Sequence, residues 1–548
     1  MPGALRILLC AVLAALAVAA PRTAAAFCGF YAGHADAALV NRATTVVLMR
    51  IGTRTVLSMR NDYVGPPEDF ALVVPVPVVL HRGDVRVLPH AIFDQLDLLT
   101  APRLVEYWEA DPCADRWYTR DSGGMTSPSF GSVSTTIVWE GGGRNGVVQV
   151  KARFEVGEYD VVVLGARDSL GLEQWLQAHG YAIPAGSAAA LRPYVQAGMK
   201  FVVAKVAIDR VRRTADGRAT LSPLRFHYDS DTFSLPIRLG LLNADGPQDL
   251  LVHVIADRRY QASNRVNLAI PTNLDVFPVT RDAFSQFYAA LFDRTVAAAP
   301  GAVVTEYAWE SWGADVGAKC DPCPAPPLDE ATMLSLGGDV LWKPLTGSIP
   351  REVEQNPTTA PLPAQPDEPH LAQPVGRRVG LEVGEGRTRV DGPREPRRLV
   401  FTRLHMRYGA ADLGEDLVLQ AAPAITGGRE QGPPLPHGPR VDDGPNQFQA
   451  RYAIRHAWAG EIACAEPQRG HWGGPPDSKL RREPSVAIDT AFVARDAPLS
   501  RFLVGEAGPA EVLVPALSES PAGGCARCET GPGGLLALLL LLRRRRRR

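Results

Sequence analysis

The chain has 548 residues, of which 46% are hydrophobic, so it can bury a sizeable core and is not a disordered protein as a whole. Its formal net charge is −1, but Arg6, Arg22 and the six arginines at 543–548 lie in terminal segments. Without these eight positive charges the net charge falls from −1 to −9, so the composition excludes a typical nucleic-acid-binding protein.

The first 26 residues have the pattern of a secretory signal peptide. Arg6 supplies a positive charge, residues 7–20 are apolar but too short to span a bilayer comfortably, and Ala24-Ala25-Ala26 forms a small-residue cleavage site. Cys28 does not fit a lipoprotein signal, because Phe27 stands before it where a small residue is needed. We therefore expect an exported chain that begins at Phe27, with an uncleaved anchor as the alternative.

Residues 27–340 predict a main α+β domain, made mostly of antiparallel strands with several amphipathic helices. Two β-rich runs, 44–51 and 53–59, flank Gly52 and predict a hairpin. A third run, 70–77, contains two prolines that favour the edge of a sheet. Residues 90–108 show helical spacing of apolar side chains, with a break at Pro102.

Two more helical regions follow in this domain. A helical hairpin begins at Asp168 or Ser169, turns at Gly180 and continues in a second helix at 188–195. The apolar face of 283–296 predicts an amphipathic helix with Thr280 as its cap. Strands are predicted at 146–154, 159–164, 201–208, 221–228, 233–239 and 250–256.

The last third of the chain changes composition repeatedly. Residues 341–398 are rich in Pro, Glu, Arg and Gln and predict a disordered linker, and 399–476 is again rich in strands. Residues 477–524 predict a disordered stalk that leads to a sorting tail at 525–548.

The tail has the order cysteine, apolar run and arginine cluster. Cys525 and Cys528 precede the apolar run 535–542, which even when counted from Gly531 is only a marginal transmembrane helix. The six arginines that follow favour the cytoplasmic side of the membrane. This order resembles the myxobacterial C-terminal sorting tail (MYXO-CTERM). The resemblance implies that the partners include a membrane and a sorting protease, and that Cys525 or Cys528 is the processing or attachment residue. A basic low-complexity end without a signal is the alternative.

Several dispersed motifs are similar to one bacterial family. They are CGFY (28–31), NDYVGPPEDF (61–70), APRLVEYW (101–108), FHY (226–228), LPIRLG (235–240), CDPCP (320–324), LGEDL (413–417) and PQRGHWGGP (467–475). The set resembles the exported bacterial family called domain of unknown function 2330, from about residue 28 to residue 476. The resemblance implies an envelope protein in which 399–476 belongs to the same unit as the first half, and it supplies no activity or catalytic residue.

The cysteines are candidates for disulfides, since cysteines of exported proteins usually pair. Cys320 and Cys323 form a C-x-x-C motif, but the surrounding prolines disfavour the helix start of a redox site. We expect a structural disulfide there, with redox catalysis and metal binding as alternatives. Our preferred second bridge joins Cys28 to Cys113 and leaves Cys464 over, although Cys464 could equally pair with either.

Other polar and aromatic residues offer weaker hypotheses. His227, Asp229 and Asp231 are the candidates for a hydrolase or calcium site, because their spacing puts both carboxylates on one face of a strand. A polar turn is the simpler interpretation. Tyr107, Trp108 and Trp472 are candidates for a ligand-stacking surface or, more commonly, for core residues. The histidines His34 (near Asp36), His456 and His471 are more commonly surface or core residues than metal ligands.

No nucleophile elbow, zinc-protease motif or phosphate-binding loop is present in the sequence. The sequence therefore favours a non-catalytic structural, adhesive or binding module, without catalytic residues, cofactor or metal, at the cell envelope or outer surface. A secreted hydrolase is the first alternative, and a thiol-redox protein that uses Cys320 and Cys323 is the second.

Overall fold

The computed structural model describes most of the chain up to residue 513. The described residues are 30–32, 40–64, 70–113, 148–181, 183–184, 186–213, 219–243, 246–312, 323, 326–342, 398–409, 411–412, 414–428, 440–442, 444–480, 482, 485–488, 490–508 and 510–513. The chain divides into two compact units, Met1–Val514 and Pro515–Arg548, and the described residues all belong to the first. The predicted signal peptide 1–26, residues 343–397 of the predicted linker and the sorting tail 525–548 lie outside the described residues.

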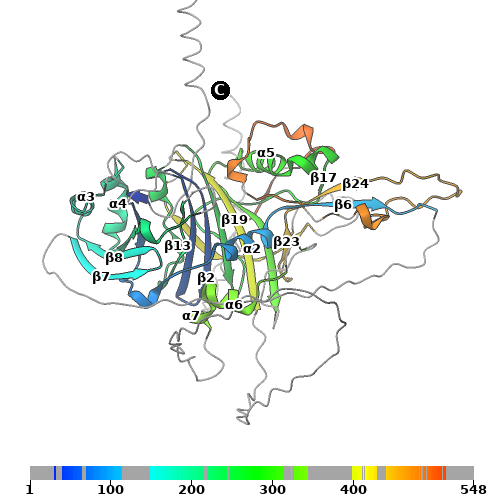
Figure 1. Cartoon of the computed structure of the whole chain (residues 1–548). Coiled ribbons are helices and arrows are strands. Elements are labelled where there is room, and N and C mark those ends of the chain that lie inside the picture. Colours follow the sequence, from blue (N-terminus) through cyan, green and yellow to red (C-terminus); the bar gives the residue numbers. More distant parts are fainter. Residues whose placement is uncertain are drawn as a thin grey trace, which may run out of the picture. The chain divides into compact units, whose positions relative to one another are not determined.

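The largest sheet has twelve strands and contains the predicted hairpin as two neighbouring inner strands; Figure 1 shows β2 among the long strands of this sheet. Gly52 occupies the turn with φ 60°, which favours glycine. The strands of the main path follow in spatial order: β22 (Arg440–Asp442), β21 (Ala424–Gly427), β23 (Gln447–Gln449), β18 (Val303–Trp312), β19 (Arg398–Tyr408), β14 (Gln248–Ala256), β2 (Val40–Ile51), β3 (Arg54–Val64), β12 (Leu224–Asp229) and β5 (Val85–Val87). Off this path, β16 (Asn267–Ala269) pairs with β18, and β27 (Glu511–Val512) pairs with β16.

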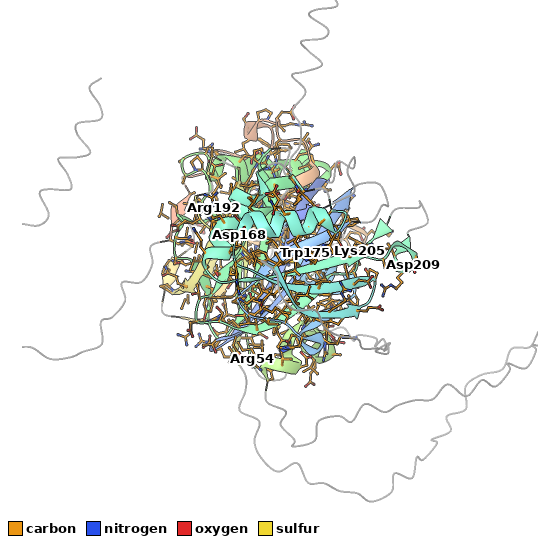
Figure 2. The ribbon with its side chains drawn as sticks, turned by 90° about the vertical axis from the view of Figure 1, so that its left-hand side faces the viewer. Arg54, Asp168, Trp175, Arg192, Lys205 and Asp209 are labelled. Carbon is orange, nitrogen blue, oxygen red and sulfur yellow. A yellow bond between two sulfur atoms is a disulfide. The ribbon has the colours of Figure 1, made fainter. Side chains whose placement is uncertain are left out.

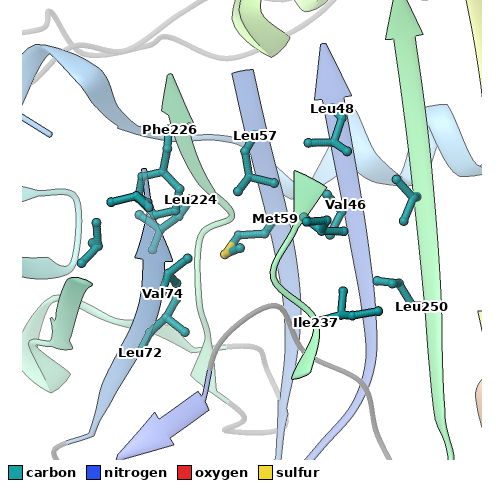
Figure 3. Close-up of a cluster of buried hydrophobic side chains, with 14 of the residues drawn as sticks. Val46, Leu48, Leu57, Met59, Leu72, Val74, Leu224, Phe226, Ile237 and Leu250 are labelled. Atoms are coloured by element: carbon teal, nitrogen blue, oxygen red, sulfur yellow. The ribbon is translucent and has the colours of Figure 1, made fainter. Parts of the chain in front are cut away.

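A second, antiparallel sheet of five strands packs on one face of the first. Its order is β1 (Phe30–Ala32), β4 (Ala71–Val76), β9 (Lys200–Val206), β8 (Tyr159–Ala166) and β7 (Val148–Val156). Alternate residues of both sheets point into a shared core that includes Leu72, Val74, Leu48 and Phe226 (Figure 3). The 70–77 run is therefore one strand in from the edge, and Pro75 is tolerated because β1 pairs only with 71–73 among the described residues.

Helices cover the outer face of the five-stranded sheet. These are α3 (Ser169–Ala178) and α4 (Ser187–Gln196), whose Leu172, Leu176 and Leu191 pack on the sheet. The Asp168 side chain accepts the backbone N–H of Gly171 and caps α3 as predicted (Figure 2).

The other face of the large sheet carries a second set of helices. Helix α2 (His90–Thr100) packs there with α6 (Glu330–Met333), the π-helix η5 (Leu334–Gly338) and α7 (Asp339–Leu341), while α5 (Phe284–Val296) forms a separate core next to them. The predicted helix 283–296 is confirmed, but Thr280 is not its cap. Thr280 lies in a preceding 3-10 helix, where its hydroxyl contacts the carbonyl of Phe502.

A third sheet corrects the prediction for residues 103–108. These residues form β6 (Arg103–Glu109) rather than a second helical piece, because β6 pairs in parallel with β24 (Arg451–His456) from the far end of the chain. The sheet also contains β17 (Leu274–Asp275), β25 (Trp472–Gly473) and β26 (Ser485–Val486).

The predicted stalk 477–524 is also wrong as far as residue 513. Residues 485–513, here called the strap, run across α5 and bury Phe502, Leu503 and Leu513 in its core. Beyond the two strands β26 and β27, the strap has its backbone fixed by hydrogen bonds such as Phe277 N to Phe502 O at 2.7 Å and Leu513 N to Asn267 O at 2.9 Å.

Short elements complete the unit. They are the sheet β13 (Ser234–Leu235), β20 (Leu417–Ala421) and β15 (Tyr260–Ala262), the ribbon β10 (Arg212–Arg213) with β11 (Ala219–Thr220), and the 3-10 helices η1 (Arg82–Asp84), η2 (Ile208–Arg210), η3 (Arg238–Asn243), η4 (Pro278–Ala283), η6 (Ser478–Leu480), η7 (Thr490–Phe492) and η8 (Leu499–Arg501). The predicted α+β class is confirmed. Within the described residues we find no helix that is both long and apolar enough to span a bilayer.

Candidate functional site

One group of charged side chains lies inside the protein, between the large sheet and the helices α2 and α5. We call it the buried ionic cluster, and it consists of Asp97, Asp249, Asp293, Glu306, Arg403, His405, Arg407 and Arg495. Its members come from α2, β14, α5, β18, β19 and the strap, so the cluster joins six segments that are distant in sequence.

A β-bulge places Glu306 at the centre of this cluster. The register between β18 and β19 shifts between Thr305 and Tyr307, so Glu306 is the extra residue and turns toward the helices. Its fully buried carboxylate accepts hydrogen bonds from the Tyr288 hydroxyl at 2.5 Å and from Arg403 Nε and His405 Nδ1, both at 2.6 Å. Burial would raise the pKa of Glu306, but His405 and Arg403 outweigh this effect and lower the pKa to about 2.

His405 lies between two carboxylates. Its Nδ1 faces Glu306, and its Nε2 faces Asp249 at 3.2 Å. Both ring nitrogens must donate to make these two bonds, so the ring is an imidazolium. Burial would lower the pKa of His405, yet the two carboxylates raise it above the usual value, and the ring of Phe292 stacks on the imidazolium at 3.9 Å.

With that proton the cluster is neutral, because four carboxylates face three guanidinium groups and one imidazolium. Asp249 accepts hydrogen bonds from His405, from Arg407 at 2.6 Å and from Arg495 Nη2, which contacts both carboxylate oxygens at 3.2 and 3.1 Å. Burial alone would raise the pKa of Asp249, but these cations lower it. Arg495 also binds Asp293 on α5 at 2.5 Å. The strap therefore supplies the last positive charge of the cluster.

His253 lies next to the cluster but is neutral. Burial lowers its pKa to about 3, with Arg403 as the second cause. The Thr100 hydroxyl donates to Leu96 O, so it accepts its 3.0 Å contact from His253 Nε2–H. Asp97, Asp249, Glu306 and the two histidines are almost fully buried, and the partly exposed Asp293 is bound by Arg495. The cluster can therefore fix strands, helices and strap together, and its buried acids and histidines offer no reactive group to a substrate.

The second group of polar side chains lies on the third sheet. We call this region the arm and define it as residues 103–113 and 451–473, which include β6, β24 and β25 (Figure 1). The base of the arm is buried at Leu104 and Tyr452, whereas most residues after 456 are exposed. A disulfide between Cys113 and Cys464 joins the chain after β6 to the chain after β24, with 5.5 Å between their Cα atoms.

Aromatic and charged side chains alternate along the arm. The Arg455 guanidinium lies between the rings of Tyr107 and Trp472, at 5.6 and 5.1 Å, and donates to Asp275 at 2.7 Å. On the other face, Trp108 stacks on His456 at 4.6 Å. The three aromatic residues predicted as a stacking surface are thus brought into one region, but not onto one face.

Glu106 connects the arm to the start of α5. It accepts two hydrogen bonds from Arg281, at 2.7 and 2.6 Å, and one from His456 Nε2 at 2.7 Å. Burial would raise the pKa of Glu106, but Arg281 and His456 lower it. The Glu106 carboxylate is therefore ionised, and both of its oxygens are already bound by side chains of the protein.

The predicted hydrolase or calcium group is not assembled. His227 contacts Asp84 at 3.2 Å, and Asp229 forms a two-pronged ion pair with Arg54 that is about half exposed. Strand β12 ends at Asp229, so Asp231 lies beyond it in a turn, and the two carboxylates do not share a strand face. Across the described residues, no group of three or more His, Cys, Asp or Glu side chains is arranged to hold a metal ion.

The disulfide pairing differs from our preferred one. Cys113 pairs with Cys464 rather than with Cys28, and Cys464 is not left over. In the structure each cysteine follows one of two strands, β6 and β24, that pair in parallel, and because β6 was predicted as a helix no sequence signal pointed to this disulfide. Cys323 is in a disulfide, whereas Cys28, Cys320, Cys525, Cys528, His34 and Asp36 lie outside the described residues.

Comparison with known proteins places the chain in a bacterial family. Residues 22–355 match the model of a family described as "Uncharacterized protein conserved in bacteria (DUF2330)", which is shorter than the resemblance expected as far as residue 476. Neither the curated proteins nor the solved structures contain a match to the chain. The chain belongs to this uncharacterised bacterial family, DUF2330.

Proposed function

We propose that the protein is exported, is held at the cell envelope or outer surface by its C-terminal tail, and acts there as a non-catalytic binding module. The observation that carries the proposal is the cross-linked arm. A disulfide joins two segments 351 residues apart in sequence, and disulfides persist mainly in oxidising compartments outside the cytoplasm. The signal-like N-terminus and the cysteine–apolar–arginine tail agree with that location.

The composition of the arm supports a binding role. Tyr107, Trp108, Trp458 and Trp472 are all partly exposed on it, and Arg455 and Arg469 lie among them. Trp, Tyr and Arg are the residue types that contribute most to protein interfaces. A catalytic role has less support, because the buried acids and histidines are bound to one another and cannot reach a substrate.

Location and processing can be tested on whole cells of the source organism. Membrane-impermeant biotinylation should label the protein, and intact mass should show a chain that begins at Phe27 and ends at Cys525 or Cys528, the cysteine that then attaches the chain in place of the removed apolar run. A full-length, unlabelled, reduced chain in the cytoplasm would refute the proposal.

The binding role needs a separate test. A photo-cross-linking amino acid in place of Ile462, which is 40% exposed on the arm, should give a discrete cross-linked product on cells. The matched control replaces Leu170 on α3, which is 57% exposed and should give none. Equal labelling from both positions would contradict a binding site on the arm.

A further inference from the structure

Exposed apolar side chains are frequent on the strap and on the segment that pairs with it. Of fourteen exposed large apolar side chains among the described residues, six come from two segments, 266–279 and 488–512, that are hydrogen-bonded to each other. They are Val266, Phe277, Val279, Ile488, Val504 and Val512. Exposed apolar residues that lie close together, rather than scattered singly, are typical of protein or membrane contact sites.

Three of these residues lie on or beside the bridge between Val276 and Leu503, and we call them the apolar patch: Phe277, Val279 and Val504, with exposed fractions of 42%, 43% and 53%. Phe277 N donates to Phe502 O at 2.7 Å, and Val504 N donates to Asp275 O at 2.9 Å. Pro278, which lies between the first two, is also exposed. The backbone is therefore fixed on both sides while the apolar side chains face solvent.

The charges near the apolar patch in sequence do not favour an anionic partner. Arg281 is already bound by Glu106, so Arg501 is left with the two exposed acids Asp282 and Glu506. These neighbours carry no excess of positive charge. The chemistry of the patch therefore fits an apolar, uncharged partner.

The strap also leads directly to the tail. Leu513 is its last described residue, and eleven residues separate it from Cys525. A fully extended segment of that length spans at most about 40 Å. If the tail is attached to a membrane, the strap is held within that distance of lipid, and the tether raises the local concentration of bilayer around the patch.

We propose that Phe277, Val279 and Val504 dock into the outer part of a lipid bilayer when the tail holds the protein there. This inference rests on the proposed envelope attachment, because three partly exposed side chains are too weak an anchor alone and need a second signal. Because the patch is neutral, docking depends little on the charge of the lipid or on salt. The surface therefore sets which side of the folded unit faces the membrane and leaves the other sides available to partners.

The test uses the full chain with a polyhistidine tag after Arg548, bound to phosphatidylcholine vesicles that contain a small fraction of nickel-chelating lipid. Hydrogen exchange is measured on the bound and the free protein. Docking predicts slower exchange at 274–280 and 502–506 in the bound protein, with no change in α3, β7 or β22. Unchanged exchange at both patch segments of the tethered protein would overturn the inference.

Variants identify the side chains responsible. The triple variant Phe277→Ser, Val279→Ser, Val504→Ser should lower the ratio of docked to undocked protein about tenfold and abolish the slowing. The matched control, Val150→Ser, Leu170→Ser, Val441→Ser, changes equally exposed side chains elsewhere and should keep it. If hydrogen exchange at 274–280 and 502–506 is still slowed in the triple variant, the inference is also overturned. If the triple variant does not fold, the exchange of the unaltered protein alone decides whether the apolar patch docks.

The anchoring proposal fails in a distinguishable way. The untagged chain is tested for flotation with phosphatidylcholine vesicles, which reports on the tail. No flotation of the untagged chain, together with slowed exchange in the tagged chain, would refute tail anchoring while supporting the apolar patch. Binding only to a protein partner, without vesicle protection, counts against the patch as a lipid surface.

Discussion

Removing the central cation of the buried ionic cluster should destabilise the protein strongly. The change is Arg403→Met, which keeps much of the side-chain volume but removes the charge that binds Asp97 and Glu306. Arg403 is 2% exposed and Glu306 is 0% exposed, so the carboxylates left behind cannot be solvated. Breaking a buried pair from one side costs about 3–5 kcal/mol of unfolding free energy.

The assay is urea-induced unfolding followed by circular dichroism. The matched control is Arg54→Met, since Arg54 also donates two hydrogen bonds to carboxylate oxygens, both of Asp229, but on the surface, where 46% and 54% of the two side chains are exposed. That variant should lose less than about 1 kcal/mol. Adding Asp97→Asn to Arg403→Met should recover about 1–3 kcal/mol, because the stranded carboxylate is neutralised. Equal small losses at Arg403 and Arg54 would refute the importance of the cluster.

Three other perturbations test separate parts of the structure. The raised pKa of His405 means that its proton stabilises the fold fully below about pH 6.5, and that this contribution is lost as the pH rises through the folded value. The unfolding free energy of the unaltered protein, measured between pH 6 and 9, should therefore fall toward that of His405→Gln, and a constant difference would contradict the imidazolium. Gly428→Ala should lower the unfolding free energy by more than about 2 kcal/mol, because φ is 76° and the new Cβ would lie 1.9 Å from Gln449 O. The control Gly52→Ala places its Cβ in open space and should lower the unfolding free energy less in the same urea assay. A chain that ends at residue 397 should not fold, because β18 and β14 lose β19, the strand between them. By contrast, cleavage at a protease site introduced within 343–397 should leave the two pieces associated on size-exclusion chromatography.

Local patterns predict the elements whose contacts lie close in sequence. The hairpin at Gly52, the cap at Asp168 and the apolar face of α5 all follow from neighbouring residues, and the structure confirms them. Strand β18 was missed, and β6 was taken as a helix. The partner of β6 lies almost 350 residues away, so no nearby residue reports the pairing.

The buried ionic cluster could not be predicted for a related reason. Strand β19 alternates Arg403, His405 and Arg407 with Leu404 and Met406, and such alternation ordinarily indicates one buried and one solvent-exposed face. The polar face is buried here because acids from four distant segments supply its counter-charges. Glu306 reaches it only through the bulge in β18, which has no signature in the sequence.

The position of β19 also explains why the folded unit is larger than the matched family region. The match ends at residue 355, yet β19 begins at Arg398 and lies between β18 and β14 over its whole length. The strap then adds Arg495 to the cluster and closes the core over α5. The first 355 residues therefore contain strands and acids whose partners arrive only with 398–513. The large sheet and the charge balance of the cluster are thus completed by residues from the end of the described chain, so the unit cannot reach its final fold before 398–513 are present.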